Sequence, residues 1–199
     1  MKFFDQAGFF RTSSFRPAAS RLTPLSERLG SATHKEQARL EAALAALDLS
    51  SPSEYCRFLR FHLVARTGVE KWLRGHAPAD LRPPEQTALI AHDLGALGEL
   101  PPGCAPAFAG GTGEGWLGAA YAVAVVHLGN RAILNRIDAD NLPSAFIGDP
   151  DMAAYWQRLK PLLEEGSAKA AAADVLNTAR AVFGHFSGVA ATTGAVLPA

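Results

Sequence analysis

The amino-acid sequence predicts an all-α protein with a single domain. Apolar residues recur at the three- and four-residue spacing of amphipathic helices along most of the chain, and no segment alternates apolar and polar residues as a strand would. No internal repeat or second composition regime divides the 199 residues, and 48% hydrophobic content is enough for one buried core. We expect a helical domain over residues 23–190, a Phe-rich basic arm before it (residues 1–22) and a tail after it (residues 191–199).

Charge, cysteine content and the length of apolar runs argue against several classes of function. Nineteen basic residues balance nineteen acidic ones, so no overall field favours binding to nucleic acid. Cys56 and Cys104 form no disulfide framework or metal-binding spacing, which is typical of a reducing compartment. The longest apolar run, residues 116–128, is shorter than the roughly 20 residues that span a bilayer. We therefore expect a cytoplasmic protein with no membrane span.

The first half of the chain predicts three helices. Thr33 and Glu36 have the spacing of a capping box, so the first helix is expected over residues 33–48. The sequence Ser51-Pro52-Ser53-Glu54 is typical of a helix start, and an apolar stripe continues from it. The pair Pro83-Pro84 marks the next start, and Leu100-Pro101-Pro102-Gly103 a stop. The second and third helices are therefore expected over residues 53–74 and 84–97.

The second half predicts three more helices. A Pro- and Gly-rich segment, residues 103–115, indicates a loop that leads into a long apolar helix over residues 115–137. Residues 138–150 contain several helix breakers and indicate a broken stretch. Apolar residues at helical spacing then predict a helix over residues 150–164 and a final one over residues 167–187.

General catalytic motifs are weak in this sequence. The glycines of GGTGEG, residues 110–115, open a helix, but no strand precedes them and no Lys follows, so a flexible turn is the better interpretation than a phosphate cradle. There is no G-x-S-x-G or H-E-x-x-H motif, and the six histidines are scattered singly. The residues give no support to a serine hydrolase or a metal site.

The predicted helices carry an ordered series of motifs: Leu29-x-x-Ala32-Thr33, Tyr55-x-x-Phe58-Leu59-x-x-His62, Asp93-Leu94-x-x-Leu97-Gly98, Trp116-Leu117-Gly118-x-x-Tyr121, Leu128-Gly129, Trp156-x-x-Leu159 and Ala179-x-x-x-Phe183-x-x-Phe186. In this order the series resembles the haem oxygenase family, and among its members the short bacterial enzymes found beside bacteriophytochromes. The resemblance implies a single-domain haem-oxygenase-like bundle. It also implies a haem held between a proximal helix with a His ligand and a kinked, glycine-rich distal helix, and oxidised to biliverdin, CO and Fe²⁺.

The proximal helix departs from the family pattern A-T-x-x-x-H-x-x-x-[D/E]. Thr33 and Glu41 match its flanks, so the position of the ligand His falls on Gln37. An amide nitrogen has no available lone pair and its carbonyl oxygen is a weak, hard donor, so an iron bond from Gln37 would be much weaker than one from imidazole. His34 is an alternative ligand, because it lies on the same side of the helix about one turn away.

The distal helix departs too. The family pattern Y-V-x-E-G-S-x-L-G-G aligns with residues 121–130, where Tyr121 and Gly129 are retained, Val125 and Val126 replace Gly and Ser, and Asn130 replaces the last Gly. Glycine lets a flat macrocycle lie against backbone, whereas β-branched side chains hold it off. We expect the valines to fill the cleft and to remove the polar position that anchors proton delivery.

Further residues near this helix have two interpretations each. His127 is either a distal ligand or, as we favour, a buried His with a hydrogen-bond partner, and His62 is expected in the core or at the rim. Arg131 and Arg136 either contact haem propionates or simply complement the helix C-terminus.

Both departures predict a haem-oxygenase-like protein without haem-degrading activity, a binding or regulatory pseudoenzyme with no resident cofactor. The alternatives are a true haem oxygenase that binds haem through a ligand such as His34, and a sensor of another small hydrophobic molecule in the same cleft. The predicted ligand is a tetrapyrrole or another hydrophobic molecule. The arm, whose aromatic residues are Phe3, Phe4, Phe9, Phe10 and Phe15, has two alternative roles: docking of a protein partner, or packing on its own domain.

Overall fold

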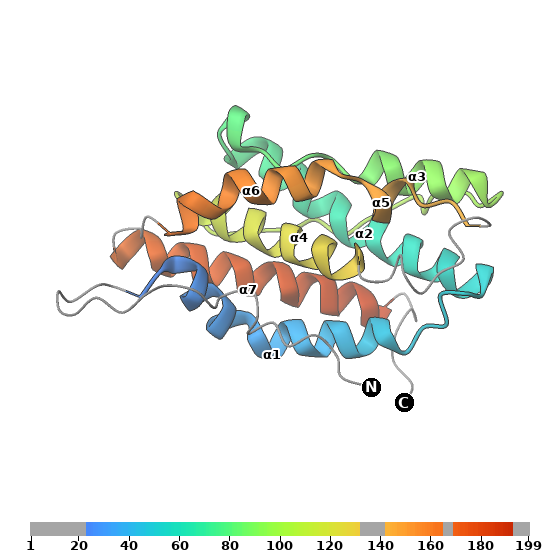
Figure 1. Cartoon of the computed structure of the whole chain (residues 1–199), viewed down its shortest axis with the longest axis horizontal. Helices are drawn as coiled ribbons and strands as arrows, with labels where there is room; N and C mark the ends of the chain where they lie inside the picture. The colour runs from blue at the N-terminus through green and yellow to red at the C-terminus, as the bar shows by residue number, and fades with distance from the viewer. Residues whose placement is uncertain (1–22, 132–141, 165–168, 193–199) are drawn as a thin grey trace.

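The computed structural model describes residues 23–131, 142–164 and 169–192, with side chains of the last segment described from residue 172. Within these ranges the chain is helical and has no strand, which confirms the all-α prediction (Figure 1). The elements are α1 (Leu25–Ala45), α2 (Pro52–His76), the 3₁₀ turn η2 (Ala79–Leu81), α3 (Thr87–Ala96), α4 (Gly115–Arg131), α5 (Ala145–Gly148), α6 (Asp151–Glu164) and α7 (Lys169–Thr192). Predictions for residues 1–22, 132–141 and 193–199 lie outside the described residues.

α7 is the element on which α1, α2 and α4 assemble. It packs against α1, α2 and α4, and in Figure 1 it runs between α1 and α4. α6 covers α4 and also contacts α1, while α3 lies against α2. Aromatic side chains fill the centre of the core, all of them fully buried: Tyr55, Phe58, Phe61, Phe146, Tyr155, Phe183 and Phe186.

α4 approaches α7 at backbone distance. A Cβ atom at Gly118 would overlap the carbonyl oxygen of Val175 and crowd the amide nitrogen of Ala179. Only a glycine lets the two helix axes come this close. The contact fixes α4 on α7 at one point along its length.

The predicted start of the first helix is wrong. α1 begins at Leu25, eight residues before Thr33, and Thr33 lies buried inside the helix with its hydroxyl donating to the Leu29 carbonyl at 2.8 Å. A Thr hydroxyl can satisfy a carbonyl one turn back as easily as it can cap a helix, so its presence does not mark a start. The upstream turns form because Leu25 and Leu29 are buried.

The third helix starts at Thr87, three residues later than predicted, because its first amides are held from outside. The Glu70 carboxylate of α2 accepts hydrogen bonds from the backbone N–H groups of Gln86 at 3.1 Å and Thr87 at 3.3 Å, and from the Thr87 hydroxyl at 2.9 Å. A carboxylate next to unpaired N-terminal amides is favourable. This cap comes from a residue 16 positions upstream of Gln86, so local sequence does not reveal it.

The broken stretch predicted over residues 138–150 contains one helical turn, α5. The Asp93 carboxylate of α3 accepts from the N–H groups of Ala145 at 3.1 Å and Phe146 at 2.9 Å, and so anchors the start of this turn. Asp93 is fully buried, and Phe146 points into the core. The other predicted helices are present with ends that differ by a few residues, and the part of the predicted fourth helix beyond Arg131 lies outside the described residues.

Two features that the described residues lack bear on function. None of the helices in these ranges combines the length and apolar character needed to cross a bilayer. The same ranges contain no group of three or more His, Cys, Asp or Glu side chains arranged to hold a metal ion.

The close contact of α4 with α7 predicts the effect of a single methyl group. Gly118→Ala should lower the free energy of unfolding by about 1–3 kcal/mol or more, because its Cβ must displace the α7 backbone. Urea denaturation followed by circular dichroism measures this change.

Gly184, on the exposed side of α7, is the matched control, since nothing lies within 4 Å of a Cβ there. Gly184→Ala should raise stability by about 0.5–1 kcal/mol, because alanine is the better helix former. Equal effects of the two substitutions would contradict the close approach of α4 to α7.

Candidate functional site

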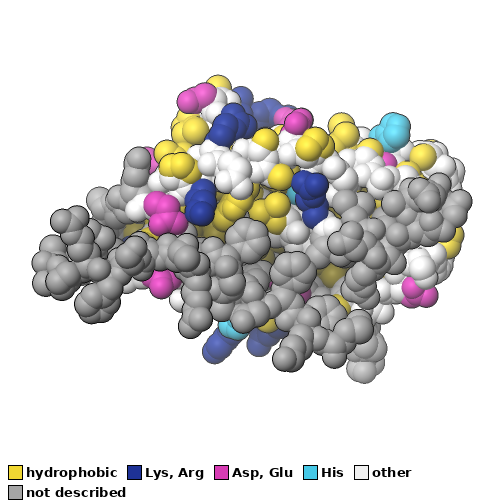
Figure 2. Space-filling view, viewed as in Figure 1, with side chains coloured by type: hydrophobic (Ala, Val, Ile, Leu, Met, Phe, Trp, Pro, Cys, Tyr) yellow, Lys and Arg dark blue, Asp and Glu magenta, His cyan; other side chains and the backbone are white. Residues whose placement is uncertain are grey.

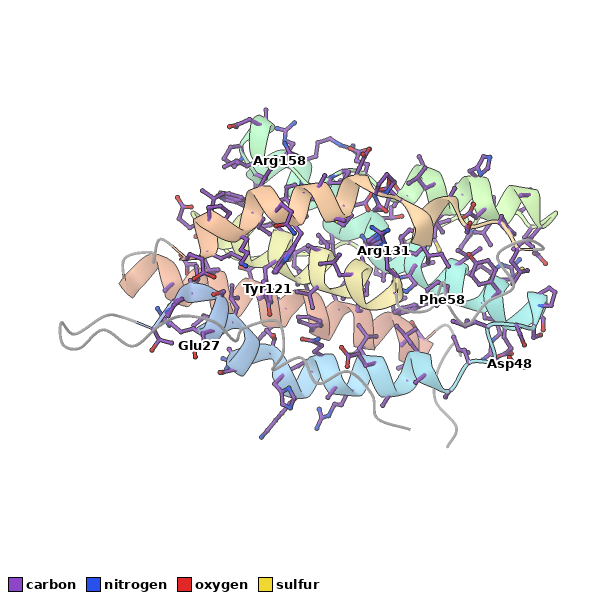
Figure 3. All side chains as sticks on the ribbon, viewed as in Figure 1. Glu27, Asp48, Phe58, Tyr121, Arg131 and Arg158 are labelled. Atoms are coloured by element: carbon purple, nitrogen blue, oxygen red, sulfur yellow. The ribbon has the colours of Figure 1, made fainter. Side chains whose placement is uncertain are left out.

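The candidate site is the side of α4 that is turned away from α2 and lies between α1 and α6. Tyr121, Val125 and Leu128 share this side at the i, i+4, i+7 spacing of one helix face. Trp156 of α6 packs beside Tyr121, with ring centroids 6.1 Å apart. Figure 2 shows hydrophobic side chains at the surface in the centre of this view, over α4, and Figure 3 shows the same region with Tyr121 labelled.

Tyr121 connects α4, which carries the site, to α1, which borders it. Its hydroxyl lies close enough to the Thr33 hydroxyl to affect the Tyr121 pKa, and it is 4.0 Å from where a Cβ at Gly30 would stand, so α4 touches α1 here. Burial raises the pKa of Tyr121, and the proximity of Thr33 offsets part of that rise. The hydroxyl is therefore neutral and serves as a structural link at one end of the site.

Gln37 lies on α1, one turn beyond Thr33, and is half-buried. Its amide nitrogen donates to the Glu41 carboxylate at 2.8 Å, an i,i+4 pair along the same helix. The amide is thus engaged along the helix surface, and its remaining oxygen is a weak donor to a metal. His34, the alternative ligand, is exposed on α1.

The two valines of α4 occupy different environments. Val125 is half-buried on the side shared with Tyr121, so its branched side chain stands in the candidate site. Val126 is buried in the core, and its spacing groups it with Val123 and Asn130, which contact α2. Of the two substitutions, Val125 is the one that bears on the surface of the site.

The end of α4 carries the remaining predicted residues. Gly129 is exposed, and a Cβ there would meet nothing within 4 Å. Asn130 turns inward, with its amide nitrogen 3.1 Å from Nε2 of the buried His62. Arg131 is half-buried at the end of α4 (Figure 3), and Arg136 lies outside the described residues.

His127 does not lie on the candidate-site face. It is fully buried, with its ring edge against Phe146 at a centroid distance of 5.4 Å. Within the described residues neither ring nitrogen makes a hydrogen bond of normal geometry, although the backbone of Asp149 is close enough to affect its pKa. Burial and the nearby Arg66 lower the pKa of His127 to about 3, so the imidazole is neutral.

His127 belongs to a buried polar contact between α2 and α4 that sequence reasoning did not identify as a unit. We call this contact the α2–α4 seam; its members are His62, Arg66, Glu70, Gln86, His127, Asn130, Phe146 and Asp149. A signal for it exists in the sequence, because His62, Arg66 and Glu70 recur every four residues within an otherwise apolar stripe.

The residues present do not fit a haem iron in the manner of the resembled family. Gln37, at the position that the sequence predicts for the proximal ligand, is an amide hydrogen-bonded to Glu41, and His34 is exposed. The buried imidazoles of His62 and His127 belong to the seam between α2 and α4, away from α1. No step of a haem reaction can therefore be derived from this site.

The link between α1 and α4 predicts a stability coupling. Tyr121→Phe should cost about 0.5–1.5 kcal/mol, the usual net value of one hydrogen bond. Because Thr33 is the partner, Thr33→Val combined with Tyr121→Phe should cost less than the sum of the single changes, measured by urea denaturation. Strict additivity would show that the two hydroxyls do not interact.

Comparison with known proteins identifies the fold. No protein-family model matches the sequence. No curated protein matches it either. Among solved structures, the chain is similar to the NO- and CO-bound haem oxygenase from Neisseria meningitidis, with a TM-score of 0.66, 17% sequence identity and coverage of 88% of this chain and 94% of that chain. At this level of identity the likeness shows a haem-oxygenase-like fold and leaves activity to be argued from the site.

Proposed function

We propose that this haem-oxygenase-like chain does not degrade haem and acts as a binding or regulatory protein. The observation that carries the proposal is Gln37, whose amide donates to Glu41 at 2.8 Å at the position aligned with the iron ligand. Ring opening in the resembled family requires an iron held by imidazole, which activates O₂. Without that ligand the fold keeps a binding surface and loses the redox centre.

The distal side supports the same proposal. Val125 projects β-carbon branches from the face of α4 that a flat macrocycle would have to approach. The exposed Gly129 alone retains bare backbone there. A ligand of this surface would then contact side chains, at ordinary van der Waals separation, where the family has glycine.

A hydrophobic molecule with an acidic edge is the ligand that this face suits best. Val125, Leu128 and Trp156 supply apolar contacts, and Arg131 supplies a cation at the end of α4. A tetrapyrrole held through its apolar face and its propionates meets this description without iron ligation. We place the protein in the cytoplasm, in keeping with its cysteine content, and assign partner docking to the Phe-rich residues 1–22.

Hemin titration tests the proposal. The unmodified chain should give no sharp Soret band with the spectrum of a His-ligated ferric haem, and no bilin absorbance after ascorbate is added. Gln37→His combined with Val125→Gly should produce the His-type spectrum, since it restores an imidazole facing bare backbone. Val126 is left unchanged because it is a core residue.

The matched control is Arg39→His combined with Val125→Gly. Arg39 is exposed on α1 and lies two positions from Gln37, roughly 200° around the helix, so the new imidazole points elsewhere. This control should remain without the His-type spectrum. Turnover of haem by the unmodified chain would overturn the proposal, and loss of that turnover in His34→Gln would identify His34 as the ligand.

A further inference from the structure

The α2–α4 seam contains more buried hydrogen-bonding groups than it has partners for. His62, Arg66 and His127 are each fully buried, and around them Nδ1 of His62, Nε and Nη1 of Arg66 and both ring nitrogens of His127 have no partner among the described residues. Unpaired buried polar atoms destabilise the closed state, because opening returns them to water. The seam is therefore a place where opening costs less than elsewhere in the core.

Arg66 is the fixed charge of the seam. Burial lowers the pKa of Arg66 to about 10, so it remains a cation at neutral pH. One of its terminal nitrogens donates to the Val123 carbonyl at 3.3 Å, and its other terminal nitrogen lies 3.9 Å from the Glu70 carboxylate. Its guanidinium carbon sits 5.2 Å from the centre of the Phe146 ring.

The two histidines surround the same ring. The centroids of His62 and His127 lie 5.3 Å and 5.4 Å from that of Phe146. Burial lowers the pKa of His62, and the charge of Arg66 and the nearby His127 lower it further. Protonating either imidazole would add a second buried cation next to Arg66, so both stay neutral while the seam is closed.

The other charged groups around the seam do not offset an added proton. Arg131 on α4 lowers the pKa of His127. Asp149, which follows α5, raises this pKa, but by less than burial and Arg66 lower it. From the α3 side, Gln86 donates to Asp149 at 2.8 Å, and Asp93 is occupied by the amides of α5. On α7, His185 lies against α2, where it contacts the Ala65 carbonyl at 3.2 Å.

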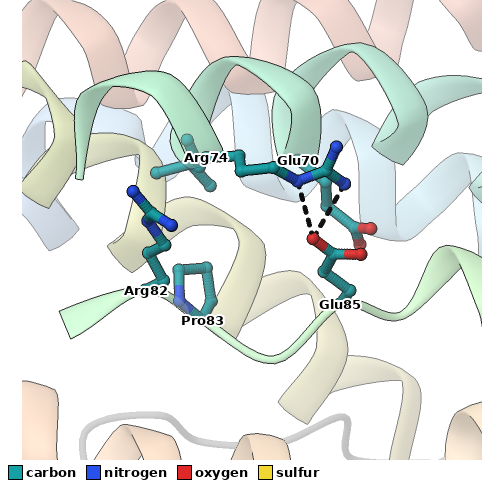
Figure 4. A pocket seen from close by; sticks show the side chains of 6 residues that line it. Glu70, Arg74, Arg82, Pro83 and Glu85 are labelled. Carbon is teal, nitrogen blue, oxygen red and sulfur yellow. Dashed lines mark hydrogen bonds and ion pairs between the residues drawn. The ribbon is translucent and has the colours of Figure 1, made fainter. Parts of the chain in front are cut away.

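The seam also reaches the surface through Glu70. This carboxylate forms part of a small pocket of about 20 Å³, enough for about one water, between α2 and the segment before α3 (Figure 4). Arg74 and Glu85 pair at 2.8 Å beside it. Burial raises the pKa of Glu70, so mild acid removes the counter-charge of Arg66 sooner than an exposed Glu would.

We propose that the α2–α4 seam is a proton-operated latch that holds α5 and the second half of α4 in place at neutral pH and releases them when His62 and His127 become charged. In the open state both imidazoles regain ordinary titration near pH 6.5. Each then favours opening by up to about tenfold per pH unit below that value. The other side of the released half of α4 is the candidate site, so its shape changes with pH.

Hydrogen exchange of the full chain tests the latch. Amides of residues 123–131 and 145–149 should lose protection by about 100-fold between pH 7.5 and pH 5.5, after correction for intrinsic rates, because two imidazoles each contribute about tenfold. Amides of α1 should change little. Equal loss of protection in all helices would overturn the proposal, since it would mean global unfolding.

Substitutions separate the contributions of His62 and His127 to the pH response. His127→Leu removes two unpaired nitrogens and one titrating group, so the change in protection should fall to about tenfold. Adding His62→Gln, which keeps an acceptor for Asn130, should abolish it. The matched control His185→Gln lies outside the seam and should keep the full 100-fold response. A response that persists in the double variant would overturn the proposal.

Nuclear magnetic resonance of the unmodified chain gives a second measurement that requires no variant to fold. The imidazoles of His62 and His127 should remain neutral as the pH falls through 6.5, the ordinary pKa of histidine. Six ordinary histidine titrations would overturn the proposal.

Discussion

The approach of α4 to α7 at Gly118 is the constraint on which the candidate site depends. α1 packs on the same helix, and the Arg180 side chain of α7 donates to the Ala32 carbonyl of α1 at 3.0 Å. α7 therefore sets where both α4 and α1 lie. Because a glycine determines how closely α4 sits on α7, the depth of the surface between α1 and α4 follows from one missing methyl group.

The core of this protein is apolar around α7 and polar between α2 and α4. A buried Arg next to two neutral imidazoles is a costly arrangement, which Glu70, a backbone carbonyl and an aromatic face only partly compensate. The same carboxylate caps α3, and Asp93 holds α5, so buried acids join elements that do not follow one another in the chain. Polar contacts thus decide how the smaller helices dock, while apolar contacts decide that they dock at all.

Helical spacing was sufficient to predict the fold class and most helices, because each long helix buries one apolar stripe. It failed where a distant side chain determines a boundary, as Glu70 does at Thr87 and Asp93 does at Ala145. The predicted start of α1 at Thr33 was wrong because, in the sequence, a Thr inside a helix cannot be told from a capping Thr. The sequence indicated that Gln37 and Val125 are unusual, but not that Val126 and His127 turn towards α2, since a single residue step around a helix separates the surface from the core.

The position of α7 has a consequence for how the chain assembles. α7 follows α1, α2 and α4 in the chain, yet all three pack on it. A chain emerging from the ribosome therefore carries three apolar surfaces that have no final partner until α7 is made. Such a topology places the contacts of α7 with α1 and α2 between distant parts of the sequence, which slows folding.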